Sequence, residues 1–309
     1  DVMGAVLDRN GLRPSRYYIT KSGDVILSSE VGVMPVPEED IVLKERLHPG
    51  KILLVDTVKG EIVDDDTLKE RYATKQPYGE WLDSNLVELK SLKIPNVRVE
   101  DYEGTELTKM QQAFGYTYEE YRQSIYNMAL NGSEGIAAMG TDTPLAVLSE
   151  KHQPLFNYFK QLFAQVTNPP IDSIREKVVT STTVYLGTDG NVLEEKAENC
   201  KQLKINDPIL TNTDLLKIKN MKVDGFKVET IPIIYYKNTS LEKAIDHLFV
   251  EVDRAHREGA NIIILSDRGV DENHVAIPSL LAVSALQQYL VQTKKRTAMA
   301  VILESGEPR

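Results

Sequence analysis

The sequence predicts an α/β protein in which a parallel sheet with connecting helices is preceded by a β-rich segment. Three observations lead to this class. Residues 1–64 contain short strand-like runs between turn residues, and residues 241–303 alternate helix and strand patterns. The 309 residues are 41% hydrophobic and 27% charged, which is normal for a folded soluble protein of one or two domains.

The β-rich segment opens the chain. Its first apolar run is followed by Asn10-Gly11, a strong hairpin signal because both residues tolerate positive φ. Later runs flank turn residues at 21–24 and 59–60, so the whole segment is predicted to be a meander of short strands. The expected strands are Val2–Leu7, Tyr17–Thr20, Val25–Ser28, Lys51–Thr57 and Glu61–Val63.

Helical patterns follow from residue 66. Residues 66–75 are predicted to be helical, and the unpatterned stretch after them places a domain boundary near residue 95. Thr117 and Glu120 form a capping-box pattern at the start of another helix.

A helical period continues over residues 155–166 and predicts a helix with a buried aromatic face. Pro169 is expected to end that helix at Asn168, and Asp172 to cap the next one. The face consists of Leu155, Phe156, Phe159, Leu162, Phe163 and Val166.

The clearest unit lies near the end of the sequence. Thr239 and Glu242 form a second capping box before an apolar helical face that runs to Ala255, and Gly259 stands where a helix C-terminal glycine belongs. The continuously apolar run Ile262–Leu265 predicts a strand covered on both faces. A helical run at 278–292 and a second apolar strand at 298–303 complete a βαβ unit, which implies a parallel sheet.

Composition excludes several function classes. The net charge of −10 argues against general nucleic-acid binding, and no apolar run approaches the length of a membrane span. Cys200 is the only cysteine, which favours a reducing, cytoplasmic location and excludes an iron–sulfur cluster held by this chain alone. The five histidines lack metal-motif spacing, and no glycine-rich phosphate loop occurs.

Asp267 and Arg268 form the candidate strand-end polar site, because they follow the strand at 262–265. Ligands of parallel α/β sheets bind at the carboxyl ends of strands, so these two side chains could hold a polar substrate. The more ordinary interpretation is that they pair with each other or with neighbouring loops.

Four segments resemble the large (alpha) subunit of glutamate synthases, in the family's order. The first is similar to the DRNGLRP segment late in that family's glutaminase domain. The others are similar to its GxDTPLAVLS, FAQVTNPPID and ILSDRG segments. They lie at Asp8–Pro14, Gly140–Ser149, Phe163–Asp172 and Asn261–Val270.

The resemblance implies a large enzyme that makes two L-glutamate from L-glutamine and 2-oxoglutarate. An N-terminal-nucleophile glutaminase domain releases ammonia, which travels internally to a (β/α)₈ barrel that binds FMN, with electrons passing through an iron–sulfur cluster. A central domain, similar to an incomplete or degenerate (β/α) barrel, joins the two. Residues 1–95 then correspond to the C-terminal part of the glutaminase (amidotransferase type 2) domain, and residues 96–309 to the central domain.

The resemblance further implies a non-catalytic fragment. Residue 1 is Asp and the sole cysteine lies at 200, so no nucleophile, other catalytic residue, cofactor ligand or metal ligand of the family is carried over, and we expect a piece of a longer chain. Its expected partners are the glutaminase core, the FMN-binding domain and a small electron-donating subunit, with no nucleic acid and no membrane.

An ammonia channel needs polar, uncharged walls. The candidate lining residues beside the rigid Pro169-Pro170 loop are Thr167, Asn168, Ser181 and Thr182.

Two other interpretations stay open from the residues alone. The chain could be a self-standing α/β enzyme that binds a small molecule at Asp267 and Arg268, or an interaction module that docks other subunits through an apolar patch. The electron donor of a parent enzyme, pyridine nucleotide or ferredoxin, is not determined by this sequence.

Overall fold

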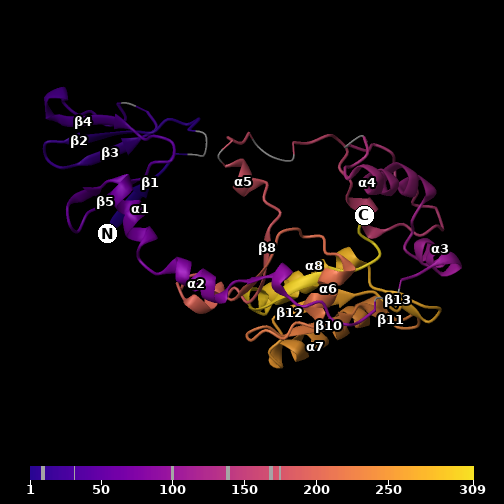
Figure 1. The fold of residues 1–309 in the computed structure, drawn as a ribbon. Coiled ribbons are helices and arrows are strands. Elements are labelled where there is room, and N and C mark those ends of the chain that lie inside the picture. The colour runs from indigo at the N-terminus through magenta and orange to yellow at the C-terminus, as the bar shows by residue number, and fades with distance from the viewer. Residues whose placement is uncertain (8–10, 31, 99–100, 137–139, 167–169, 174) are drawn as a thin grey trace. The chain divides into compact units, whose positions relative to one another are not determined.

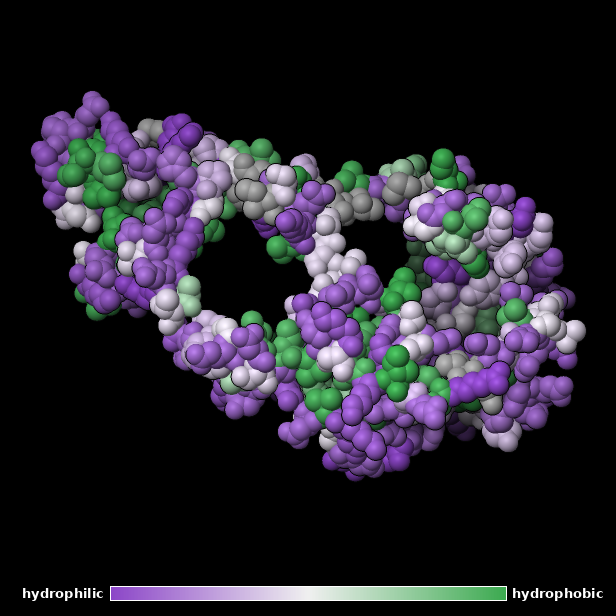
Figure 2. Space-filling view, viewed as in Figure 1, coloured by the Kyte–Doolittle hydropathy of each residue, from purple (hydrophilic) through white to green (hydrophobic). Residues whose placement is uncertain are grey.

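The computed structural model describes all residues except 8–10, 31, 99–100, 137–139, 167–169 and 174. The chain divides into two compact units (Figure 1). The first unit comprises Asp1–Tyr78 and Asn168–Ser181, and the second comprises Gly79–Thr167 and Thr182–Arg309. Hydrophobic residues reach the surface at several places on both units (Figure 2).

The first unit contains two antiparallel sheets of three strands. One has the order β3-β2-β4 and the other β1-β5-β6. The hairpins predicted at the two turns are confirmed, since Ile19 pairs with Val25 and Asp56 with Glu61. The strands are β1 (Val2–Ala5), β2 (Arg16–Thr20), β3 (Val25–Ser28), β4 (Ile41–Arg46), β5 (Leu53–Asp56) and β6 (Glu61–Val63).

The predicted meander is wrong at its first turn. β1 pairs antiparallel with β5, with Val2 opposite Asp56, and not with β2. The chain therefore changes sheets between β1 and β2, so these two strands do not form a hairpin. Gly11 adopts a positive φ of 63°, and Asn10 lies outside the described residues. β4 was not predicted from the sequence, because its second half, Lys44-Glu45-Arg46, consists of charged residues. These residues are exposed in the structure.

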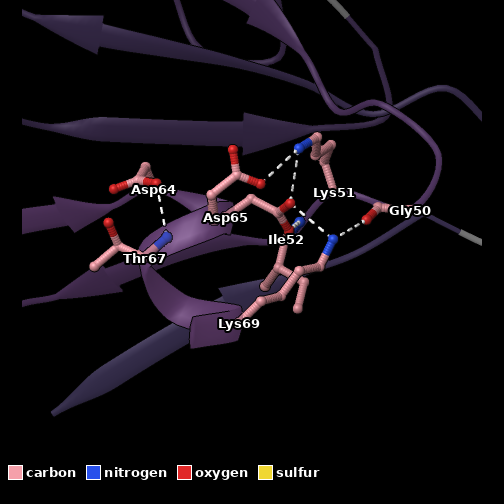
Figure 3. A network of polar contacts seen from close by, with 8 residues as sticks. Gly50, Lys51, Ile52, Asp64, Asp65, Thr67 and Lys69 are labelled. Atoms are coloured by element: carbon pink, nitrogen blue, oxygen red, sulfur yellow. Dashed lines mark hydrogen bonds and ion pairs between the residues drawn. The ribbon is translucent and has the colours of Figure 1, made fainter. Parts of the chain in front are cut away.

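Helix α1 (Asp65–Ala73) confirms the helix predicted at 66–75 and is fixed by its first carboxylates (Figure 3). Asp64 caps it by accepting the Thr67 N–H at 2.9 Å. Asp65 accepts the backbone N–H of Ile52 at 2.9 Å and pairs with Lys69 at 2.8 Å and Lys51 at 2.9 Å. The hydrogen bond from Lys69, with those from Lys51 and Ile52, holds the pKa of Asp65 well below its usual range. This network joins the start of α1 to the residues before β5.

The second segment of this unit carries the short helix α5 (Glu176–Val179). Asp172 accepts the backbone N–H of Arg175 at 2.9 Å, but it is not the N-cap of α5, because the helix starts at Glu176 and its N-cap is Arg175. The helix predicted to start near Ser173 therefore begins later than expected.

The second unit is built on a parallel sheet of order β10-β12-β14, whose strands are β10 (Val228–Pro232), β12 (Ile262–Ser266) and β14 (Ala300–Glu304). Helices α7 (Leu241–Arg257) and α8 (Ser279–Gln292) cover one face, where Ile263 and Leu265 pack among helix residues such as Leu248 and Leu286. The predicted βαβ unit is therefore confirmed.

The other face of the parallel sheet is covered by α6 (Asn212–Lys219) and by a mixed sheet of order β7-β9-β8. Ile262 and Ile264 pack here with Leu203 and Ile218, and all four are 0% exposed. Because β12 is buried on both faces, its continuous apolar run follows directly from its position. The remaining strands are β7 (Val87–Glu88), β8 (Val184–Gly187), β9 (Gln202–Ile205), β11 (Ile234–Tyr236) and β13 (His274–Ala276).

The cap of α7 differs from the prediction by one residue. Ser240, not Thr239, is the N-cap, and it accepts the backbone N–H of Lys243 at 3.4 Å. Thr239 instead donates its backbone N–H to Tyr236 in the preceding turn, so it stands outside the helix. Gly259 follows the helix with a φ of 90°, as predicted for a C-terminal glycine.

A group of helices lies between residues 78 and 131, with the short strand β7 after its first helix. The Thr117–Glu120 capping box is confirmed in both directions, with Glu120 N–H to Thr117 Oγ1 at 3.1 Å and Thr117 N–H to the Glu120 carboxylate at 3.0 Å. The box opens a π-helical stretch, Glu120–Ile125, that runs into α4. The helices of this segment are α2 (Tyr78–Asn85), α3 (Gly104–Ala113) and α4 (Tyr126–Asn131).

The aromatic stripe at 155–166 does not form the predicted buried helix. Only the 3-10 turn Leu155–Phe159 is helical, and Phe163 is 74% exposed. The reason is a close approach of two backbones. Thr141 donates its N–H to the carbonyl of Gln161 at 2.9 Å, and a Cβ on Gly140 would lie 2.7 Å from the carbonyl oxygen of Leu162. This extended contact excludes a helix over 161–163 and places two of the motif segments against each other.

Candidate functional site

The strand-end site lies where β12 and β14 finish. Asp267 directly follows β12 and is 4% exposed. It accepts the Ser305 hydroxyl at 2.5 Å and the backbone N–H of Gly306 at 3.2 Å. Burial raises the pKa of Asp267, and these two hydrogen bonds only partly offset that effect. Asp267 therefore holds the segment after β14 and does not pair with Arg268.

Glu304, the last residue of β14, is the centre of the site. It accepts hydrogen bonds from Lys219 of α6 at 2.8 Å, from Ser266 at 2.7 Å and from Arg268 Nε at 2.6 Å. Burial alone would raise the pKa of Glu304, but these hydrogen bonds, led by that of Lys219, outweigh it and lower the pKa. One carboxylate thus ties α6, β12 and the loop after β12 together.

Sequence reasoning identified Asp267 and Arg268 but missed Glu304 and Lys219. Parallel pairing places Ser266 opposite Glu304. The signal that could have found Glu304 is therefore the register of the two predicted strands, in which the residues after each apolar run become neighbours. Lys219 carried no such signal, because α6 was not predicted.

The segment after β14 is fixed by further polar contacts within the second unit. Glu307 accepts both the backbone N–H and the hydroxyl of Ser279, at 2.6 and 2.5 Å, at the start of α8. The Tyr116 hydroxyl donates to the carbonyl of Gly306 at 2.8 Å. Arg309 lies 3.9 Å from the ring centroid of Tyr116 and 3.4 Å from the Glu120 carboxylate. These contacts connect the end of the parallel sheet to the helical segment.

Two cavities open at this end of the sheet. A cavity of about 820 Å³ has mostly charged walls, including Arg268, Lys219 and Glu304. A second one, of about 810 Å³, is mostly apolar and shares Arg268 and Glu304 with the first. The structure therefore brings the predicted strand-end residues to a cleft with one charged and one apolar half.

Two of the four predicted channel residues, Thr167 and Asn168, lie outside the part of the chain that the structure describes. Ser181 and Thr182 are exposed, and Thr182 donates its hydroxyl to the carbonyl of Asn206 at 3.0 Å. Their role in a channel stays a prediction.

Outside the gaps in the described range, no group of three or more His, Cys, Asp or Glu side chains is placed to hold a metal ion. No helix in the same residues is both long and apolar enough to span a membrane.

Two families match consecutive stretches of this chain. Residues 1–81 match the class-II glutamine amidotransferases, and residues 109–309 match the glutamate synthase central domain.

Relatives match almost the whole chain. It is 44% identical over 307 residues to the glutamate synthase [NADPH] large chain of Bacillus subtilis, covering 99% of this chain and 20% of the relative. The chain is 41% identical over 310 residues to ferredoxin-dependent glutamate synthase 2 of Synechocystis, again covering 99% of this chain and 20% of the relative. It is 40% identical over 319 residues to glutamate synthase [NADH] of Schizosaccharomyces pombe, covering 99% of this chain and 15% of the relative. The chain spans a fifth or less of these relatives, and it belongs to the glutamate synthase family.

Proposed function

We propose that this chain is the connecting part of a glutamate synthase large chain and carries none of its catalytic residues. The observation that carries the proposal is the order of the two family matches, an amidotransferase stretch at 1–81 followed by the central domain at 109–309. In the proposed parent reaction, L-glutamine is hydrolysed to L-glutamate and ammonia, and the ammonia condenses with 2-oxoglutarate with loss of water. Two electrons from pyridine nucleotide or ferredoxin, with two protons, then reduce the product to a second L-glutamate. The connecting part would shield ammonia from water, where protonation would remove its nucleophilic lone pair.

The proposed domain division is 1–95 and 96–309. The boundary near residue 95 falls in the stretch between the two matched ranges. For the second domain we propose an incomplete (β/α) barrel. This is supported by the order of β10, β12 and β14, which neighbour one another in chain order, as barrel strands do.

The proposed cofactors belong to other parts of the parent chain. FMN and an iron–sulfur cluster would be held by a synthase domain, since a cluster needs several thiolates and Cys200 is the single cysteine here. The proposed partners are the remaining glutaminase core, the FMN-binding domain and a small electron-donating subunit. The single cysteine supports a reducing compartment such as the cytoplasm, although some relatives are named chloroplastic.

The deciding experiment measures glutamine hydrolysis, glutamate formation and flavin absorbance on one sample of the 309-residue chain. We expect no ammonia release, no glutamate and no bound flavin, while the full-length parent shows all three. Glutamine turnover or a bound yellow cofactor in the 309-residue chain would contradict the proposal and direct mutagenesis to Asp267 and Arg268.

We propose Thr167, Asn168, Ser181 and Thr182 as lining of the ammonia path. The test is Asn168→Trp in the full-length parent, with Asn238→Trp on an exposed turn as the matched control. A blocked path should leave glutamine hydrolysis running while the yield falls from two glutamates per glutamine toward one, because released ammonia is lost. If the yield stays at two, Asn168 does not line the path.

A further inference from the structure

The cleft at the carboxyl ends of β12 and β14 has the position and construction of a small-molecule site. Ligand sites of parallel α/β sheets form outside the carboxyl ends of strands, and they combine apolar walls with a few polar groups. Both features are present here. The two cavities of about 820 and 810 Å³ share Asp101, Tyr102, Arg268 and Glu304 in their walls, so they adjoin, and together they are called the cleft.

The charged half carries both signs of charge in nearly equal number. Its described walls hold three cationic side chains and four carboxylates. A ligand with a single charge would meet as much repulsion as attraction, whereas a zwitterion can place each of its charges beside an opposite one. The cations are Arg98, Lys219 and Arg268, and the carboxylates are Asp101, Glu103, Glu106 and Glu304.

Arg268 is prepared to bind a carboxylate. Its Nε is held by Glu304 at 2.6 Å, which fixes the guanidinium, and the side chain is still 40% exposed. A guanidinium has five N–H donors, and within the described part of the chain no hydrogen bond uses those on its two terminal nitrogens. Those donors match the two oxygens of a carboxylate in bidentate geometry. Asp101 and Glu106 line the same cavity and could accept from an ammonium group.

The apolar half of the cleft indicates the chemistry of the remaining part of the ligand. Its walls include Leu107 and Met110 of α3, Phe114 directly after that helix, and Leu186, Val301 and Leu303 of the two sheets. A neutral, apolar group attached to the zwitterion would lie there and remove its surface from water.

We propose that this cleft binds a free α-amino acid with a neutral, apolar side chain. The carboxylate lies on Arg268, the ammonium group beside Asp101 or Glu106, and the side chain against α3. Binding needs no chemistry from the chain, so it is compatible with a non-catalytic connecting domain and gives that domain a way to sense an amino acid.

The test is isothermal titration of the 309-residue chain with L-methionine and with two analogues that each lack one charge. L-Methionine methyl ester removes the carboxylate charge, and the corresponding 2-oxo acid removes the ammonium group. We expect saturable binding of L-methionine with Kd on the order of 1 mM or tighter. Each analogue should bind at least about tenfold more weakly, since each loses one charge-assisted contact. Equal binding of all three compounds, or no saturable binding of L-methionine, would overturn the proposal.

Two variants locate the binding. Arg268→Ala removes the carboxylate donor, and Leu107→Trp fills the apolar half while leaving the Glu304 contacts in place. Each should weaken binding at least about tenfold. Arg254→Ala, which breaks an exposed ion pair to Glu251 on α7, is the matched control and should bind as the wild type does. Circular dichroism confirms folding of each variant, and unchanged binding in a folded Leu107→Trp protein would exclude this cleft.

Discussion

Replacing Glu304 by Gln should destabilise the second unit by about 2 kcal/mol at pH 7. The substitution keeps the shape of the side chain and removes its charge. Glu304 is the acceptor for α6, for β12 and for the loop after β12, so the change tests whether this one carboxylate holds the end of the sheet together.

The magnitude follows from these contacts. The Glu304 side chain is 9% exposed, and a buried ion pair that loses one partner costs about 3–5 kcal/mol. Two features reduce that figure. Arg268 is 40% exposed and Lys219 is 25% exposed, so water replaces part of what they lose. The amide of Gln also keeps one oxygen as an acceptor. The estimate therefore falls to about 2 kcal/mol.

The effect should depend on pH with a defined sign. The pKa of Glu304 is lowered in the folded state, from an ordinary value of 4.5. A lowered carboxyl pKa contributes stability that is fully present above the ordinary value and is lost as the pH falls through the folded pKa. The difference between wild type and Glu304→Gln should thus be complete at pH 7 and shrink below pH 4.5. Asp267, whose pKa is raised, has the opposite slope, but it is present in both proteins and largely cancels in the difference.

The assay is urea unfolding followed by circular dichroism and by the fluorescence of Trp81, the single tryptophan, in α2. Glu251→Gln on α7 is the control, because Glu251 also pairs with an arginine, at 2.7 Å, but outside the sheet. The control should change the free energy of unfolding by less than about 0.5 kcal/mol. The reasoning is refuted if Glu304→Gln unfolds at the same urea concentration as this control.

Two further substitutions test other contacts. Gly306→Ala should destabilise the second unit by about 1–3 kcal/mol in the same urea assay, because the new Cβ would lie 2.9 Å from the ring of Phe114. Gly79→Ala, where no atom lies within 4 Å, is the control, and equal stability of the two variants would contradict the prediction. Asp65→Asn should speed hydrogen exchange at the Ile52 N–H at pH 7. The hydrogen bond from Lys69 lowers the pKa of Asp65, so the difference should still be present at the ordinary Asp value of 3.8 and be lost only as the pH falls from there through the lowered pKa. Exchange at the wild-type rate would show that Asp65 does not protect this amide.

Local signals predicted the elements whose determinants lie close together in sequence. The Thr117–Glu120 box formed as expected because its two partners are three residues apart. The βαβ unit formed because two continuous apolar runs and the helical period between them agree over about 40 residues. Four long motif segments were enough to identify the family.

The candidate site was only half predictable. The position of Asp267 and Arg268 after a buried run pointed to the carboxyl end of a strand, and the structure places them there. Glu304 lies in the site because the parallel register places it opposite Ser266. Lys219 lies there because α6 packs on the sheet. Neither contact has a local sequence signal, because the partners lie 38 and 85 residues from Glu304.

By itself, then, the sequence determined the family, the α/β class and the elements that short-range hydrogen bonds and periodic burial specify. Tertiary structure alone decided which distant backbones meet. It paired β1 with β5 in place of β2, and it set Gly140 against the Leu162 carbonyl, so that Phe163 is exposed and not in a helical core. The physical reason is that a helical period shows only which apolar side chains would share a face if a helix formed. Whether the helix forms is decided by competition with long-range backbone contacts.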